Sequence, residues 1–375
     1  MIEALTLTDF RNHARTRIKS AGHRNIIITG GNGGGKTAVL EAVSMFGGNG
    51  GLRGATMAEV ARDTGAGGFA VSAELADGTT LSVAWSAGDA CRRARIDNDA
   101  AAISDCARYL RMVWITPRED RLFLDGASER RAFFDRLTAS FAPAHAGRTA
   151  RLAKLLSERA FALKNGSDHN WLCPIEKHLA ETAVAVAGAR VKYAGEINHE
   201  LSKPESPEPK VANSATDSGS RLSAFVTLSG WLEDRLAAGI AAADAEREYL
   251  EYLANNRELI ADKMSAEGAH KSDFGMFDSR LNKRASMAST GQQKMMMMGL
   301  IIAHARLIKT KTGMSPVILL DEAAAHLDAA ARAKLFAELG DMSAQVWATG
   351  LERAVFGDVP DALFITCVNG TVVGH

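Results

Sequence analysis

Short apolar runs separated by turns occupy the first 120 residues, and the same pattern returns over the last 65. Runs of this length between turn residues are typical of β-strands. Sheet is therefore expected at both ends of the chain. The expected strands include Leu5 and Leu7, cover residues 25–29, 69–75, 81–85, 112–116, 317–320 and 346–349, and end in a hairpin across Asn369-Gly370.

The middle of the chain has the period of amphipathic helices, with apolar residues three and four positions apart. We expect a first helix with Leu152, Leu155, Leu156, Ala160 and Leu163 on one face, a second with Trp171, Ile175 and Leu179, and a third from about Phe225 to Ile260 with Leu228, Trp231, Leu232, Leu236 and Ile240. Residues 202–220 contain three of the eight prolines, which predicts a flexible segment where this helical arm turns back.

Composition indicates a soluble globular chain of 375 residues, with 46% hydrophobic and 23% charged residues. Lys and Arg balance Asp and Glu at 44 each, so net charge gives no argument for a nucleic-acid partner. The four cysteines lack CxxC spacing, which disfavours a zinc site or a disulfide framework and fits a reducing cytosol. The sequence shows no signal peptide and no run of roughly 18 apolar residues, so neither secretion nor a membrane is expected.

A glycine-rich segment, Gly30-Gly31-Asn32-Gly33-Gly34-Gly35-Lys36-Thr37, follows the apolar strand at 25–29 and precedes a good helix start. Backbone N–H groups of such a loop surround phosphate oxygens, the lysine reaches the β and γ phosphates, and the threonine hydroxyl binds Mg²⁺. We predict an ATP and Mg²⁺ site here, with Lys36 also catalytic. The alternative is a glycine-rich turn with a chance Lys-Thr, which the strand–loop–helix context disfavours.

A second apolar strand ends in two acids, Asp321 and Glu322. Asp321 would hold Mg²⁺, and Glu322 would orient the attacking water as a catalytic residue. A plain strand ending in exposed acids is the alternative, and the phosphate loop argues against it. Because about 280 residues separate the two halves of this site, the helical arm must be inserted into the sheet.

About 30 residues before the acidic strand, Ser289 is a fair N-cap for a helix that continues through four methionines. A cap on a buried helix is the ordinary interpretation of this segment. At this offset from the acids, however, Ser289-Thr290-Gly291-Gln292 resembles the ABC signature.

Four segments together resemble the RecF family of bacterial recombination mediators, which are SMC/ABC-type ATPases. They are Leu5–Asn12, Gly30–Thr37, Ser289–Lys294 and Leu319–Asp328, and Pro117–Leu137 matches the same family. The resemblance covers most of the chain and is weakest from about 165 to 262. It implies an α/β fold: an ABC/SMC-type P-loop ATPase head, built from residues 1–125 and 266–375, with an inserted helical arm lobe at 126–265.

By this resemblance, Arg11 and Asn12 approach the nucleotide, and Ser289, Gly291 and Gln292 cap the γ-phosphate of ATP on another subunit. Asp328 is the D-loop residue at the dimer face. Thr349 stands where many ABC proteins carry a histidine switch, although a simple strand-end threonine explains it equally well.

The resemblance also implies a function. A cytoplasmic homodimer would form on ATP, bind duplex DNA at single-strand gaps, and reopen on slow, DNA-stimulated hydrolysis. It would assist RecO and RecR in placing RecA. The basic residues Arg148, Arg151, Lys154, Arg159 and Lys164 could contact DNA phosphates, and a solvated helix face explains them as well.

Two departures from the family pattern leave roles unassigned. Residues Gly268–Phe274 lack the family's proline and one of its acids, and no glutamine marks a Q-loop near 114–118.

Other classes fit less well. A transporter ATPase subunit would normally carry Leu-Ser-Gly-Gly-Gln, and a long Rad50-type tether needs hundreds of coiled-coil residues, whereas about 50 per helix reach roughly 75 Å. A kinase would place its acidic strand closer to the phosphate loop, and a nuclease fusion needs more than the roughly 50 residues after the acids. Another SMC/ABC-type module, such as a short-armed Rad50-like tether or a transporter-type subunit, remains the alternative.

Overall fold

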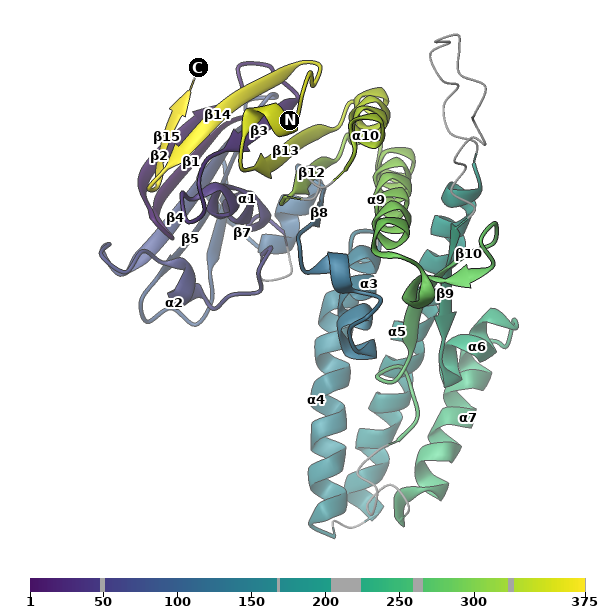
Figure 1. The fold of residues 1–375 in the computed structure, drawn as a ribbon. Helices are drawn as coiled ribbons and strands as arrows, with labels where there is room; N and C mark the ends of the chain where they lie inside the picture. The colour runs from purple at the N-terminus through teal and green to yellow at the C-terminus, as the bar shows by residue number, and fades with distance from the viewer. Residues whose placement is uncertain (48–50, 167–168, 204–223, 259–265, 323–326, 375) are drawn as a thin grey trace. The chain divides into compact units, whose positions relative to one another are not determined.

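The computed structural model describes residues 1–47, 51–166, 169–203, 224–258, 266–322 and 327–374 (Figure 1). Residue contacts divide the chain into two compact units. The first unit combines residues 1–120 with 301–375, and the second unit comprises residues 121–300. This division differs from the expected lobe at 126–265, because β10 (Asp273–Asp278) pairs with β9 (Ala224–Ser229) and holds the following segment in the second unit.

A mostly parallel sheet in the first unit joins strands from both ends of the chain. Its order is β15 (Thr371–Gly374), β14 (Ala362–Val368), β3 (Asn25–Thr29), β13 (Gln345–Gly350), β12 (Val317–Leu320) and β8 (Met112–Ile115). Only the β14–β15 hairpin is antiparallel. Every residue of the four strands from β3 to β8 is buried, as expected for parallel strands covered on both faces.

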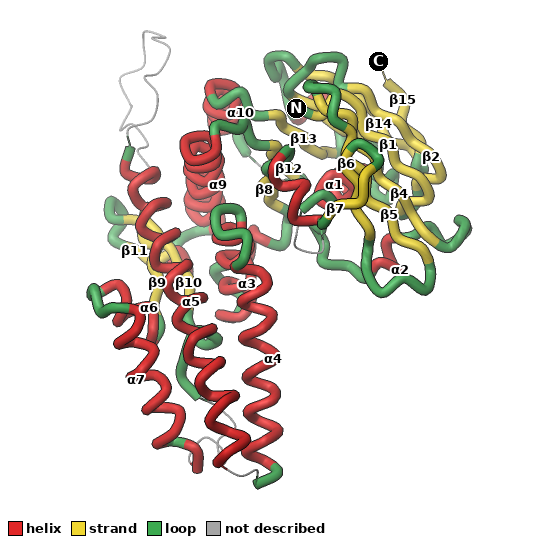
Figure 2. The backbone as a smooth tube through the Cα atoms, turned by 180° about the vertical axis from the view of Figure 1, so that it is seen from behind, coloured by secondary structure: helices red, strands yellow, loops and turns green. Residues whose placement is uncertain are grey.

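A second, antiparallel sheet covers one side of this core. Its order is β2 (His13–Lys19), β1 (Ile2–Phe10), β4 (Gly68–Leu75), β5 (Thr80–Ser86), β6 (Arg93–Ile96) and β7 (Asp99–Ala101). Buried and exposed positions alternate along β4, so one face packs inward. Helix α1 (Lys36–Ser44) contacts β1 of this sheet and β13 of the other, and Leu5, Ile26 and Val39 share one core (Figure 2).

The remaining helices of the first unit are short α2 (Met57–Val60), α10 (Ala329–Asp341) and the end of α9 (Thr290–Thr312). Asp328 is the N-cap of α10 and accepts a 2.8 Å hydrogen bond from the Ala331 N–H. Arg306 on α9 forms a 2.8 Å ion pair with Glu338 on α10. Over the part of the chain that the structure describes, no helix is both long enough and apolar enough to cross a bilayer.

Helices dominate the second unit. They are α3 (Ala127–Ala139), α4 (His145–Lys164), α5 (His169–Ser202), α6 (Trp231–Ala237) and α7 (Ala242–Asn255), and β9, β10 and β11 (Lys283–Arg284) form a small sheet. The first two expected helical stretches are confirmed, and α4 and α5 lie antiparallel side by side (Figures 1 and 2). Helix α5 has 34 residues and is about 51 Å long. It is therefore shorter than expected, since about 50 residues per arm helix would reach roughly 75 Å.

The prediction of a single helix from Phe225 to Ile260 is wrong. Residues Ala224–Ser229 form β9, whose burial alternates as in a strand. A Cβ on Gly230 would lie 2.4 Å from Glu233 Oε2, so a larger residue would displace that side chain where the chain passes from β9 into α6. Gly239, with a positive φ of 89°, then separates α6 from α7. Most of the expected flexible segment, 204–220, lies outside the described residues.

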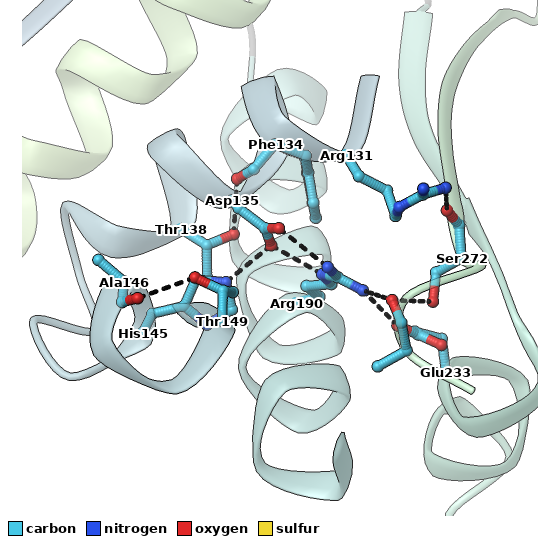
Figure 3. A network of polar contacts seen from close by, with 11 residues as sticks. Arg131, Phe134, Asp135, Thr138, His145, Ala146, Thr149, Arg190, Glu233 and Ser272 are labelled. Atoms are coloured by element: carbon cyan, nitrogen blue, oxygen red, sulfur yellow. Dashed lines mark hydrogen bonds and ion pairs between the residues drawn. The ribbon is translucent and has the colours of Figure 1, made fainter. Parts of the chain in front are cut away.

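A buried polar network crosses the helices of the second unit (Figure 3). Arg190 on α5 donates to both oxygens of Asp135 on α3, at 2.8 and 2.9 Å, and to Glu233 Oε1 on α6 at 3.0 Å. His145 Nε2 lies 2.8 Å from Asp135 Oδ1. The Arg190 side chain is 4% exposed and that of Glu233 is 1% exposed. One buried cation thus links three helices through the buried Glu233 and the partly buried Asp135, whose side chain is 19% exposed.

The same network anchors residues 268–274, whose role the sequence left unassigned. Arg190 also donates to the Ala269 carbonyl oxygen, and Arg131 donates to that of Ser272 at 2.9 Å (Figure 3). Arg130 holds both carboxylate oxygens of Asp273 at 2.7 and 2.8 Å. Here the segment packs against α3 and α5 as a structural element.

We predict that Arg190→Leu lowers the free energy of unfolding by about 3–5 kcal/mol, because Asp135 and Glu233 lose their shared cation inside the unit. Urea denaturation of both proteins measures this loss. The control is Arg247→Ala on α7, whose exposed pair with Asp244 should contribute less than about 1 kcal/mol. Equal effects of the two substitutions would contradict the prediction.

The network also predicts acid sensitivity. Burial would raise the pKa of Asp135, but hydrogen bonds from His145 and Arg190 outweigh it and lower that pKa below its ordinary 3.8. The stabilisation is therefore complete above the ordinary pKa and is lost as pH falls through the lower, folded value. Asp135→Asn should flatten the dependence of the unfolding midpoint on pH below about 4. An unchanged slope would argue against this.

Candidate functional site

The phosphate loop connects β3 to α1 in the conformation that its glycines allow. Gly30 has a φ of 142°, and a Cβ there would lie 2.2 Å from the Cys367 carbonyl oxygen on β14. Gly35, at φ 109°, is the N-cap of α1, and no side chain caps that helix end. The first N–H groups of α1 are therefore available to bind an anion.

Lys36 and Thr37 extend from the start of α1. The Lys36 ammonium donates to the carbonyl oxygens of Gly30 and Gly31 at 2.7 and 3.0 Å. An ammonium has three N–H donors, so one remains for a phosphate oxygen. Thr37 Oγ1 donates to Asp321 Oδ1 at 2.9 Å. This hydrogen bond brings together the two halves of the predicted site, 284 residues apart in the chain.

The oxygen atoms of Thr37 and Asp321 fit a magnesium ion. Both are hard donors, and Asp321 is only 6% exposed. Among the residues that can be described, no group of three or more His, Cys, Asp or Glu side chains could hold a metal. Mg²⁺ does not need one, because it keeps several waters and takes further oxygens from phosphates. The donor set therefore matches a metal bound together with a nucleotide.

Glu322 lies next to Asp321 with a positive φ of 56°. Its N–H donates to Thr349 Oγ1 at 2.9 Å, and the Thr349 hydroxyl donates to Asp321 Oδ1 at 2.8 Å. Glu322 also lines the cavity in front of the phosphate loop. Asp321 and Glu322, which follow β12, and Thr349, near the end of β13, thus belong to one hydrogen-bonded group.

Arg11 and Asn12, in the turn between β1 and β2, lie at the same cavity. Arg11 donates to both oxygens of Glu41 on α1, at 2.6 and 2.8 Å, and to the Glu59 carbonyl oxygen at 2.7 Å. The hydrogen bond to the buried Glu41 raises the pKa of Arg11. Asn12 donates to the Gly33 carbonyl oxygen at 3.1 Å. The two residues therefore hold the phosphate loop and α1 to the antiparallel sheet.

His13 is a residue of this site that the sequence pattern did not reveal. Its Nε2 lies 3.1 Å from the Gly35 carbonyl oxygen, and its Nδ1 lies 2.9 Å from Thr16 Oγ1. Burial lowers the pKa of His13 below 6.5 despite the bond to Gly35. Because a carbonyl oxygen only accepts, Nε2 carries the proton of the neutral ring. The only feature of the sequence that could have indicated His13 as a site residue is its position directly after Asn12.

The cavity has a volume of about 750 Å³ and lies wholly within the first unit. Its lining includes the loop residues from Asn32 to Thr37, together with Arg11, Asn12 and Glu322. The sequence pattern did not identify the remaining lining residues, which are Arg53, Glu59, Ala61, Arg62, Asp63 and Thr64. They lie between α1 and β4, and only Glu59 among them belongs to a helix, the four-residue α2. Irregular segments of this kind have no periodic signal.

Ser289, Gly291 and Gln292 belong to the second unit and do not line the cavity. Ser289 Oγ accepts from the Gln292 N–H at 3.4 Å, and Gln292 Oε1 accepts from the Ser289 N–H at 3.0 Å. This reciprocal pair is a capping box, so the expected N-cap is confirmed. Ser289 and Gly291 are exposed.

Of the basic residues expected on the arm, Arg148, Arg151, Lys154 and Lys164 are exposed on α4. The expectation for Arg159 is wrong. Its side chain is 3% exposed and forms a 2.8 Å ion pair with the buried Glu176 on α5. Helical spacing alone did not distinguish Arg159 from the exposed cations of α4, because Arg159 is buried only by the packing of α5 and α7 against it.

Comparison with known proteins identifies the family. The model of the RecF/RecN/SMC N terminal domain matches residues 1–372. The DNA replication and repair protein RecF of Mesorhizobium japonicum is 37% identical, over 99% of this chain and 97% of its own length. That of Allorhizobium ampelinum is 36% identical, over 98% and 97%.

A solved structure of the recombination mediator protein RecF with ATP, in the RecFOR pathway, superposes with a TM-score of 0.80 at 19% identity. It covers 100% of this chain and 99% of that one. The expected fold class, an ABC/SMC-type P-loop head with an inserted helical lobe, is confirmed. With a match along the whole chain in both sequence and fold, the chain belongs to the RecF family.

Proposed function

We propose that this protein is an ATP-dependent recombination mediator that dimerises on ATP and binds DNA at single-strand gaps. One observation carries the proposal: Thr37 of the phosphate loop bonds to Asp321, in a cavity that the loop and Glu322 line together. A loop alone fits many nucleotide-binding proteins. Its contact with the acidic strand defines a site for ATP hydrolysis.

Each residue has a distinct task in this site. The loop N–H groups and the start of α1 bind the phosphates, and Lys36 moves its free N–H toward the β and γ phosphates. Thr37 and Asp321 hold the magnesium ion, which neutralises phosphate charge when bound. Glu322 positions a water molecule for in-line attack on the γ phosphate.

A dimer would complete the site. Only residues of the first unit line the cavity, whereas the signature residues Ser289 and Gly291 are exposed elsewhere in the chain. The capping box presents the N-terminus of α9, a polarity suited to the γ phosphate on another subunit. Asp328, exposed at the N-cap of α10, would lie at the same dimer face.

DNA binding rests on the relatives, which are named DNA replication and repair proteins, and a solved RecF is assigned to the RecFOR pathway. By the same argument, RecO and RecR are the proposed partners, and the location is the cytoplasm. Arg148, Arg151, Lys154 and Lys164 are exposed cations on α4 that could contact phosphates. Such contacts make affinity fall with salt.

We predict that Lys36→Ala weakens ATP binding at least about tenfold, because the phosphates lose a charge-assisted donor. Titration with a fluorescent ATP analogue measures the change. Lys164→Ala, an exposed site on α4, is the matched control and should bind ATP as the wild type does. Equal affinity of the two variants would exclude the phosphate loop as the nucleotide site.

We also predict that Glu322→Gln traps the ATP-bound dimer. The amide keeps the shape of the side chain but no longer activates water, so hydrolysis should fall on the order of 100-fold while ATP binding persists. Light scattering with and without ATP, repeated on gapped DNA at two salt concentrations, measures assembly. Glu352→Gln, an exposed acid of the first unit, is the control. A monomer under every condition would rule out the dimeric model.

A further inference from the structure

Thr349 occupies the centre of the parallel sheet in the first unit. It lies on β13, between β12, which leads to the acids, and β3, which leads to the phosphate loop. Its register partner on β3 is Ile28, and it lies one residue beyond the Leu320–Ala348 pair of β12 and β13. The side chain is fully buried. It therefore stands between the two halves of the nucleotide site.

The hydroxyl of Thr349 is used twice. It donates its one proton to Asp321 Oδ1 at 2.8 Å and accepts the Glu322 N–H at 2.9 Å. Packing alone requires neither bond, since valine has the same β-branched shape without the hydroxyl. The hydroxyl thus ties a carboxylate of the proposed metal site to the backbone of the proposed catalytic acid.

The backbone of Glu322 needs such a hydrogen bond to keep its conformation. Its φ of 56° lies in the left-handed region, which L residues other than Asn and Asp rarely adopt and which persists only when neighbours hold it. The N–H of Glu322 points to Thr349 and so fixes the direction in which its side chain leaves β12. That side chain reaches the cavity wall.

Two hydroxyls converge on one oxygen. Thr37 and Thr349 both donate to Asp321 Oδ1, at 2.9 and 2.8 Å. When Thr37 turns its oxygen to a metal ion, Thr349 is the donor that remains to orient the Asp321 carboxylate. Groups that orient a metal ligand in this way affect metal affinity without touching the metal.

We infer that Thr349 is a positioning residue that couples metal binding to hydrolysis: its hydroxyl orients the Asp321 carboxylate and holds the Glu322 backbone left-handed. The inference rests on the proposed ATPase function. The role inferred for Thr349 differs from that of Lys36, which would contact the nucleotide itself. Losing the hydroxyl should therefore weaken Mg²⁺ binding and slow turnover but leave metal-free nucleotide binding unchanged.

Thr349→Val removes the hydroxyl and keeps the shape, and Thr349→Ser keeps the hydroxyl as the matched control. A fluorescent ATP analogue reports nucleotide affinity in EDTA and, during a Mg²⁺ titration, the half-saturating metal concentration. A steady-state assay gives kcat and KM. For the valine variant we expect unchanged affinity in EDTA, a half-saturating Mg²⁺ concentration raised by about 10–100-fold, and a lower kcat at similar KM. The serine variant should stay within about threefold of the wild type for every quantity.

Equal behaviour of the valine and serine variants would overturn the inference, and so would a loss of nucleotide affinity in EDTA for the valine variant alone. If the valine variant shows no cooperative thermal unfolding, Thr349→Ala is measured against serine with the same expectations. A wild-type protein that binds no ATP would instead refute the proposed function, and the inference with it.

Discussion

The pairing of β3 with β13 and β14 joins the two ends of the chain into one parallel sheet, and the proposed site depends on it. Hydrogen bonds along these parallel strands place the residues after β3 and after β12 at the same sheet edge. Only then can Thr37 reach Asp321 across 284 positions of sequence. Without this pairing, the loop and the acids would be two unrelated motifs.

Close packing around the phosphate loop makes it part of the core. The Gly30 Cα faces the carbonyl of Cys367, the Gly370 N–H donates to the Gly34 carbonyl oxygen at 3.0 Å, and His13 reaches the Gly35 carbonyl. The β14–β15 hairpin and the β1–β2 turn thus hold the loop from two sides. A loop fixed in this way can offer its N–H groups to phosphate without first losing conformational freedom.

The second unit is held together differently, by ion pairs between its helices. Its helices are linked by ion pairs in which one carboxylate has two partners: the partly buried Asp135 pairs with Arg190 and His145, and the buried Glu176 pairs with Arg159 and Arg257. Such pairs add specificity of packing more than net stability, because desolvation offsets most of their attraction. They also explain why the spacing of charges along α4 did not predict which residues are exposed. In sequence Arg159 resembles its exposed neighbours, and only the tertiary contact with Glu176 shows that it is buried.

Sequence by itself determined the phosphate loop, the acidic strand, most strands of the head and the first two arm helices, because each rests on local spacing and side-chain type. Strands β2, β6 and β7 were not among those expected. The third arm helix failed at Gly230 and β9, where pairing with β10 overrides a helical period. Other features were decided by tertiary structure alone. Pairing of distant strands placed Thr349 against Asp321 and Glu322, folding of a loop placed Arg53 and Arg62 on the cavity wall, and helix packing buried Arg159. These contacts join residues far apart in the chain, and no local pattern carries information about them.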